Sequence, residues 1–168
     1  LQRLMSEWKA CGEEQNYDII IPQAAEAQIA TIIPVDDATF MNPENMENAL
    51  IHYCRHHALQ VPKNKAEIVR CVLQSLAFKY RQAVEQLNRC LPSPIRQLNI
   101  IGGGSQNQLL NQLTADELGI PVYAGPVEAT AMGNILTQAM AKGEIADLRE
   151  LREIVTRSVT PQVYYPKK

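Results

Sequence analysis

Three consecutive glycines at positions 102–104 constrain the fold of this chain more than any other feature, because they separate two segments of different periodicity. Residues 97–101 have the composition of a short buried strand, and leucines at helical spacing follow the glycines as far as Gly119. A second strand is predicted at 120–124 and a further helix at 128–142. This succession of strand, turn, helix, strand and helix predicts an α/β layer.

The glycine turn has two physical interpretations. Without Cβ atoms at Gly102, Gly103 and Gly104, a flat or anionic ligand can approach the main chain closely, but the same residues also suit a tight turn that binds nothing. Ser105 and Gln108 have the spacing of a capping box, which would place backbone N–H groups and the positive end of a helix beside the turn. The sequence therefore predicts a nucleotide cradle, with a ligand-free turn as the alternative.

Common nucleotide-binding motifs do not match this turn. A Walker A loop requires a Gly-Lys-Ser/Thr ending, which is absent, and the dinucleotide fingerprint requires glycine where Asn107 stands. A Rossmann dehydrogenase is less favoured for that reason, since its third glycine allows close packing of helix on strand. The Asn107 amide offers both a donor and an acceptor, which suits an adenine edge, or else it is a solvated amide on the first helical turn.

The part of the chain that precedes the glycines predicts helices joined by loops. Asn42 is expected to cap a helix whose first residue is Pro43, and Asn64 with Glu67 has the spacing of a capping box. Pro22 is expected to open a short helix. The remaining predicted elements are helices at 1–15, 24–30 and 43–58, an extended segment at 31–35, a long helix from Asn64 to about Cys90, and a last helix from Asp147 to about Arg157 before a proline-flanked tail.

Composition limits the classes of function. With 16 basic and 18 acidic residues, the formal charge of −2 gives no field that would gather nucleic acid or anionic lipid. No apolar run approaches the length of a membrane span, and the first residues lack the pattern of a signal peptide. A cytoplasmic protein with no nucleic-acid or membrane partner is expected. The chain also lacks an initiator methionine and opens inside an amphipathic pattern, so we expect a fragment of a longer protein.

The cysteines and histidines leave alternatives open. None of the four cysteines has the short spacing of a zinc site. Two antiparallel helices joined near 61–63 would bring Cys54 and Cys71 side by side, as buried thiols or as a disulfide. His52 and His56 at i and i+4 form either a metal-binding pair or part of a solvated helix face, and no nearby carboxylate or cysteine completes a metal site. No metal ligand is predicted.

Several segments carry a specific resemblance to a known family. Residues 99–113, which contain the glycine turn, and residues 124–134 are similar to segments of the FGGY carbohydrate kinase family. The family also has a Phe-x-Asn-Pro loop before a helix, matched by residues 40–43, and a segment similar to residues 66–80. The resemblance covers nearly the whole chain and is closest to the members that phosphorylate L-rhamnulose.

The resemblance implies an α/β fold of the ribonuclease H-like, actin-like ATPase class, in which two domains close around ATP and sugar. Residues 1–168 would be the second, nucleotide-binding domain, partial and with a helical insertion. The start of this domain and the N-terminal domain, its expected partner, would be missing. The implied reaction converts ATP and L-rhamnulose to ADP and L-rhamnulose 1-phosphate, with Mg²⁺ bridging the phosphates. The fragment alone is expected to be inactive and to bind ATP weakly or not detectably.

The resemblance also implies residue roles. The family's glycine turn lies against the nucleotide, which makes Gly102, Gly103 and Gly104 cofactor-binding residues and places Asn107 at the adenine. Residues 1–3 resemble the tail of the family's Asn-x-x-Gly-x-Trp-x-x-Gln segment, which adds Gln2 as a further nucleotide contact.

The catalytic aspartate of the family lies upstream of the residues present here. No catalytic residue is therefore predicted in this chain, and Asp36, Asp37 and Asp116 are not given that role. Glu128 either supports the nucleotide pocket or only interacts favourably with the dipole of its helix. The alternatives for the whole protein are another FGGY kinase, such as one acting on L-fuculose, and a non-catalytic actin-like module that binds nucleotide.

Overall fold

The structure is a computed structural model that describes residues 1–13 and 15–167. The chain divides into two compact units, Leu1–Leu91 and Pro92–Lys168. The described part of the first unit is built from helices and loops, whereas the second combines helices with a small sheet. The α/β class predicted from the sequence is therefore confirmed, with strands confined to the second unit.

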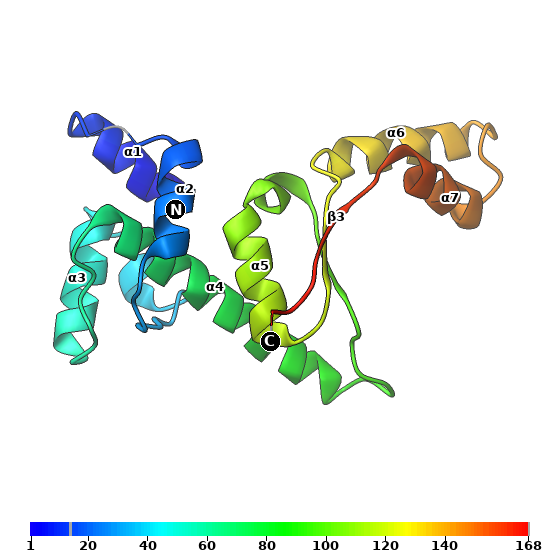
Figure 1. The fold of residues 1–168 in the computed structure, drawn as a ribbon. Helices are drawn as coiled ribbons and strands as arrows, with labels where there is room; N and C mark the ends of the chain where they lie inside the picture. The colour runs from blue at the N-terminus through cyan, green and yellow to red at the C-terminus, as the bar shows by residue number, and fades with distance from the viewer. Residues whose placement is uncertain (14, 168) are drawn as a thin grey trace. The chain divides into compact units, whose positions relative to one another are not determined.

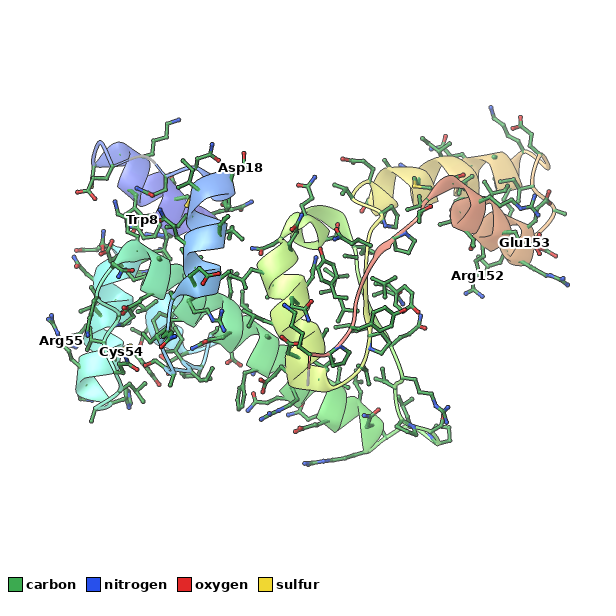
Figure 2. All side chains as sticks on the ribbon, viewed as in Figure 1. Trp8, Asp18, Cys54, Arg55, Arg152 and Glu153 are labelled. Atoms are coloured by element: carbon green, nitrogen blue, oxygen red, sulfur yellow. The ribbon has the colours of Figure 1, made fainter. Side chains whose placement is uncertain are left out.

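The first unit is a set of helices around an apolar core (Figure 1). Helix α2 packs against α4, and α1 packs against α3. Figure 2 shows Cys54 directed into the unit and its neighbour Arg55 directed outward. The elements are α1 (Gln2–Ala10), α2 (Tyr17–Glu26), the 3-10 turn η1 (Ala38–Phe40), α3 (Met46–His56) and α4 (Lys65–Asn88). The largest buried side chains are Leu4, Trp8, Ile20, Leu50, Ile68 and Leu73.

Helix α2 begins earlier than predicted and contains its proline. The side chain of Asn16 caps the helix by accepting a hydrogen bond from the Asp18 N–H at 2.9 Å. Pro22 therefore lies inside α2 and does not open it, and residues 27–30 are not helical. The prediction of a helix at 24–30 is wrong, because the cap and the buried side chain of Ile20 favour helix on the amino-terminal side of the proline.

The predicted cap of α3 is also wrong. Asn45, not Asn42, caps the helix, with Oδ1 accepting from the Asn48 N–H at 2.7 Å. Asn42 is engaged elsewhere, because its Oδ1 accepts a hydrogen bond from Arg3 at 2.8 Å. Arg3 also donates to the carbonyl of Pro43, so the Phe-x-Asn-Pro loop is tied to α1 before the helix starts.

Residues 27–34 form neither helix nor strand, yet they are closely bound to α4. Side chains of α4 form hydrogen bonds with the backbone of this segment. Gln74 Nε2 donates to the carbonyl of Thr31 at 2.7 Å, and Ser75 Oγ accepts from the N–H of Ile33 at 3.0 Å. Alternate residues from Ile29 to Ile33 are buried, which is the pattern of an extended segment. Helix side chains thus satisfy the groups that a neighbouring strand would otherwise satisfy.

Helix α4 begins as predicted from its capping box. Asn64 Oδ1 accepts from the Glu67 N–H at 2.9 Å, and Glu67 Oε2 accepts in return from the Lys63 N–H at 2.8 Å. The helix runs to Asn88, close to the predicted end near Cys90.

The second unit has a three-stranded sheet in the order β1-β2-β3. Strand β1 pairs parallel with β2, with Leu98 opposite Val122, and β3 pairs antiparallel with β2. Helix α5 covers the sheet, and its Ala115 forms a buried cluster with Val122 and Tyr164. The elements are β1 (Leu98–Ile100), the 3-10 turn η2 (Gly102–Gln106), α5 (Gln108–Leu118), β2 (Val122–Ala124), α6 (Ala129–Ala141), α7 (Leu148–Ser158) and β3 (Gln162–Tyr164).

The predictions for this unit are largely confirmed, with one omission. Gly119 ends α5 in the left-handed conformation with φ +68°, and Asp147 caps α7 through the N–H groups of Arg149 and Glu150. Helices α6 and α7 pack side by side (Figure 1). Strand β3, however, lies in the tail for which no strand was predicted. Within the described part of the chain, no helix is both long and apolar enough to cross a membrane.

Candidate functional site

The predicted site lies where two parallel strands end. Strands β1 and β2 run in the same direction, so the glycine turn after β1 and the loop after β2 leave the sheet at one edge. The Gly102 N–H donates to the carbonyl of Pro126 at 3.1 Å, and the Gly125 N–H donates to the carbonyl of Ile100 at 2.8 Å. The two loops are therefore bonded to each other at the edge where open α/β sheets bind ligands.

The glycines of the turn do not share one structural reason. Gly102 has φ +73°, a left-handed conformation in which a side chain is strained. Gly103 and Gly104 have no such φ, and a Cβ would meet nothing within 4 Å at Gly103 and only Ile100 Cγ2 at 3.8 Å at Gly104. Both are exposed. The backbone conformation therefore requires glycine at position 102. At Gly103 and Gly104 it does not, and there the glycines leave the main chain exposed at the surface.

Ser105 does not cap the following helix, which corrects the prediction from its spacing with Gln108. Ser105 is buried, with 8% exposed, and its Oγ donates to the carbonyl of Gly102 at 2.7 Å. Its own carbonyl accepts a hydrogen bond at 2.8 Å from Nδ2 of Asn111, which is 0% exposed. A buried polar chain thus lies beneath the turn, and Asn111 was not singled out from the sequence.

Asn107 caps α5. Its Oδ1 accepts from the N–H of Leu110 at 3.0 Å, so the carbonyl oxygen predicted to be available for adenine already has a partner. The Nδ2 group of Asn107 has no hydrogen-bond partner within residues 1–13 and 15–167. The half-buried amide can therefore present its donors, and a remaining lone pair, to a ligand.

Gln2 and Glu128 belong to different units of the chain. Gln2 is the first residue of α1 and is exposed, and it belongs to the first unit, whereas the glycine turn belongs to the second. Its nucleotide contact stays a prediction. Glu128 occupies the N-cap position of α6 without a side-chain cap bond, directly after the loop that accepts from Gly102. Its proposed support of the pocket likewise stays a prediction.

The aspartates that were not assigned a catalytic role have structural partners. The hydrogen bond from Lys79 holds the pKa of Asp36 below its usual value, and hydrogen bonds from Thr39 lower the pKa of Asp37. Asp116 accepts from Gln112 Nε2 at 2.9 Å and from the N–H of Lys167. Neither Asp36 nor Asp37 has the raised pKa that is typical of a general base.

The cysteines predicted to lie close to each other are both buried thiols in the structure. Burial raises the pKa of the Cys71 thiol to about 12, with a smaller contribution from Cys54, whose own pKa is also raised by burial. His52 and His56 stack with ring centroids 6.3 Å apart. Within the part of the chain that the structure describes, no three His, Cys, Asp or Glu side chains are grouped to hold a metal.

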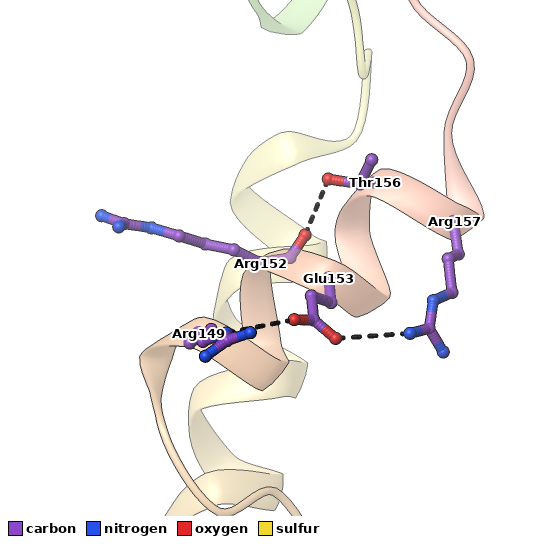
Figure 3. Close-up of a pocket in the computed structure, with 5 residues that line it drawn as sticks. All are labelled: Arg149, Arg152, Glu153, Thr156 and Arg157. Carbon is purple, nitrogen blue, oxygen red and sulfur yellow. Dashed lines mark hydrogen bonds and ion pairs between the residues drawn. The ribbon is translucent and has the colours of Figure 1, made fainter.

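One hollow lies along one face of α7 and contains none of the predicted site residues. It measures about 320 Å³, and all five of its lining residues come from that single helix (Figure 3). Glu153 lies between Arg149 and Arg157 and pairs with each at 3.3 Å, while Arg152 extends away from it (Figure 3). The arginine side chains of both pairs are more than three-quarters exposed. This is a solvated groove on one helix face, not an enclosed pocket.

A second hollow of about 230 Å³ lies in the first unit, between residues 32–36 and α4. The Lys79–Asp36 ion pair, at 2.5 Å, forms part of its lining. Neither hollow includes a residue that the sequence predicted to bind a ligand. The site therefore rests on the glycine turn and its neighbouring loop, which form an open surface.

Comparison with known proteins decides the family. The model of the FGGY family of carbohydrate kinases, C-terminal domain, matches residues 4–142, which include the glycine turn and the loop after β2. The chain belongs to the FGGY family of carbohydrate kinases. In this FGGY domain, α7 and β3 lie beyond the matched residues.

Curated relatives agree with this assignment. The FGGY chain is 44% identical over 155 residues to a rhamnulokinase of Bacteroides thetaiotaomicron, covering 92% of this chain and 32% of that protein. A rhamnulokinase of Pectobacterium carotovorum is 44% identical over 99% of this chain and 35% of its own length. One of Bacillus subtilis is 44% identical over 80% of this chain and 28% of its own length. The chain thus spans about a third of the length of these relatives.

Proposed function

We propose that this chain is the nucleotide-binding C-terminal domain of an ATP-dependent sugar kinase of the actin-like, ribonuclease H-like class. The proposed substrate is L-rhamnulose, since the three relatives compared above are rhamnulokinases. The γ-phosphoryl group of ATP passes to the 1-hydroxyl group of the sugar, giving ADP and L-rhamnulose 1-phosphate. The N-terminal domain of the full-length protein supplies the general base and most sugar contacts.

The observation that carries the proposal is the open main chain at Gly103 and Gly104. Neither position has a positive φ, and a Cβ would fit at both, so the fold of the unit gives no reason for glycine. A ligand lying on the main chain does give a reason, because any side chain would stand between the backbone and the ligand. The parallel strand ends and the free donors of Asn107 lie next to these glycines in sequence.

ATP is the proposed ligand of this surface. Gly102, Gly103 and Gly104 would lie against the nucleotide, and Asn107 Nδ2 would donate to an acceptor on the adenine ring. Gln2 is proposed as a further contact. The Mg²⁺ ion of such a reaction would be held mainly by the phosphates. Since no suitable group of side chains is found within residues 1–13 and 15–167, we assign no Mg²⁺ ligand to this chain.

An activity assay on the full-length protein tests the proposal. ADP formation is measured with ATP, Mg²⁺ and each of L-rhamnulose, L-fuculose and D-xylulose, with a sugar-free reaction as the control. Turnover is expected to be fastest with L-rhamnulose. Faster turnover with L-fuculose would show that the proposed substrate is wrong and that the proposed sugar kinase reaction is correct. ATP binding without turnover on any sugar would instead indicate a nucleotide-binding module that is not a kinase.

The isolated 168-residue chain provides a second measurement. Gly103 and Gly104 are exposed, and the proposed N-terminal domain would supply the opposite side of the site, so calorimetric titration with ATP is expected to give very weak or undetectable binding. Micromolar affinity for the isolated chain would show that the N-terminal domain is not needed to complete the site.

A further inference from the structure

The glycine turn is held from beneath by two hydrogen bonds in series. Ser105 Oγ donates to the carbonyl of Gly102 at 2.7 Å, and Asn111 Nδ2 donates to the carbonyl of Ser105 at 2.8 Å. The first bond closes the turn on its own first residue, and the second ties the turn to α5. Asn111 is 0% exposed, so the second bond is shielded from water.

Stability alone does not explain an amide at position 111. The Oδ1 atom of Asn111 is buried and has no hydrogen-bond partner within the described part of the chain. A buried amide oxygen without a partner destabilises the folded state. Leucine has a similar shape and would remove this unpaired oxygen, at the cost of the bond to the Ser105 carbonyl. The feature that distinguishes asparagine from leucine here is therefore the Nδ2 donor, which bonds to the glycine turn.

We infer that Asn111 is a positioning residue for the nucleotide site, an inference that rests on the proposed function. Three consecutive glycines have many accessible backbone conformations when they are not restrained. Ordering them during binding would lower the affinity for the nucleotide. Asn111, acting through Ser105, holds Gly103 and Gly104 in one conformation before the ligand arrives, without touching the ligand.

The test compares Asn111→Leu with the unmodified full-length kinase. The KM for ATP should rise about three- to tenfold, the range expected for one lost hydrogen bond. The kcat and the KM for L-rhamnulose should stay unchanged. The melting temperature should change little, because leucine removes the unpaired oxygen but also leaves the Ser105 carbonyl without its donor. A lower melting temperature with unchanged KM for ATP would show a purely structural role and overturn the inference.

Ser105→Ala tests the same relay without altering the buried amide. It removes the bond to the Gly102 carbonyl and should also raise the KM for ATP. Since both side chains act on one turn, the double variant should have a smaller effect than the product of the single effects. Independent, multiplicative effects on the KM for ATP would mean that the two residues do not form a relay.

Hydrogen exchange separates failure of this inference from failure of the proposed function. In full-length protein carrying Asn111→Leu, deuterium uptake over residues 101–107 should increase, while uptake over β2 should not change. This measurement needs neither ATP nor activity. An inactive unmodified protein would reject the proposed kinase activity alone, whereas unchanged uptake over 101–107 would reject the positioning role alone.

Discussion

The Oδ1 atom of Asn107 accepts a hydrogen bond from the backbone N–H of Leu110 at 3.0 Å. The same side chain that is proposed to contact adenine therefore also starts α5. Its oxygen serves the helix and its nitrogen is available for the ligand. Because the two roles use different atoms, substitutions can separate them.

Asn107→Asp should keep the helix cap and lose the donor, since aspartate caps helices about as well as asparagine. We expect an unchanged melting temperature and a KM for ATP about three- to tenfold higher in the full-length protein. Asn107→Ser, which also caps but is neutral and shorter, controls for the added charge. Asn107→Ala should additionally destabilise the protein by about 1 kcal/mol. An unchanged KM for ATP in both the Asp and Ser variants would contradict the adenine contact.

Gly103→Ala and Gly102→Ala should affect different properties. At Gly103 a methyl group meets no atom within 4 Å, so stability should change by less than about 1 kcal/mol while the KM for ATP increases. At Gly102, φ +73° makes alanine cost about 1–2 kcal/mol. Denaturant unfolding gives the first quantity and steady-state kinetics the second. Equal ATP kinetics in Gly103→Ala and the unmodified full-length protein would argue against a ligand on this main chain.

Ser75→Ala should destabilise the first unit by about 1–3 kcal/mol, because the buried N–H of Ile33 loses its acceptor. Ser75 is 1% exposed. Ser6→Ala, on an exposed position of α1, is the matched control and should change stability by less than about 0.5 kcal/mol. Urea unfolding followed by circular dichroism measures both. Similar small changes in the two variants would mean that water replaces the lost acceptor.

The thiols should divide into two classes. Cys11 and Cys90 are exposed and should react with iodoacetamide in the native protein at pH 8, whereas Cys54 and Cys71 are buried and should react only after unfolding. Mass spectrometry counts the labels, and denatured protein without reductant should show all four as free thiols. Two missing thiols would reveal a disulfide.

The raised pKa of Cys71 also gives a pH dependence of stability. Its folded value is about 12 against an ordinary value of 9.0, so the unfolded chain loses this proton first as the pH rises. The contribution of the neutral thiol to stability is therefore complete below about pH 9 and decreases between pH 9 and 12. Cys71→Ala should reduce the dependence of the unfolding free energy on pH in that interval. Equal slopes for the two proteins would contradict a raised pKa.

Capping patterns in the sequence were reliable where the side chain had no competing partner. Asn64 and Gly119 mark helix ends in both the sequence prediction and the structure. Asn42 failed as a cap because Arg3, which is 39 residues away in the sequence, binds its side chain. Ser105 failed because a carbonyl three residues earlier accepts its hydroxyl hydrogen. Local spacing cannot show such partners.

The position of the candidate site can be predicted from the sequence, but the buried hydrogen bonds beneath the glycine turn cannot. The glycines and Asn107 were found because unusual residues stand between a strand and a helix. The loop at Pro126 could have been found from the rule that parallel strands end at one edge. Asn111 gave no comparable signal, since an asparagine on a helix is ordinarily solvated and only burial distinguishes it. Strand β3 was not predicted, because a three-residue strand flanked by prolines is too short to show an alternation of apolar and polar residues.

The attachment of residues 27–34 to α4 has a consequence for how this protein tolerates sequence change. The polar part of this contact uses two backbone carbonyls of the segment, which every amino acid carries, and the N–H of Ile33, which only proline would lack. Gln74 and Ser75 contribute side chains that few residues can imitate. Mutational drift should therefore be freer at exposed positions such as Ala30 and Ile32 than on the helix face opposite them. The information that shapes this loop is encoded more than 40 residues downstream of it.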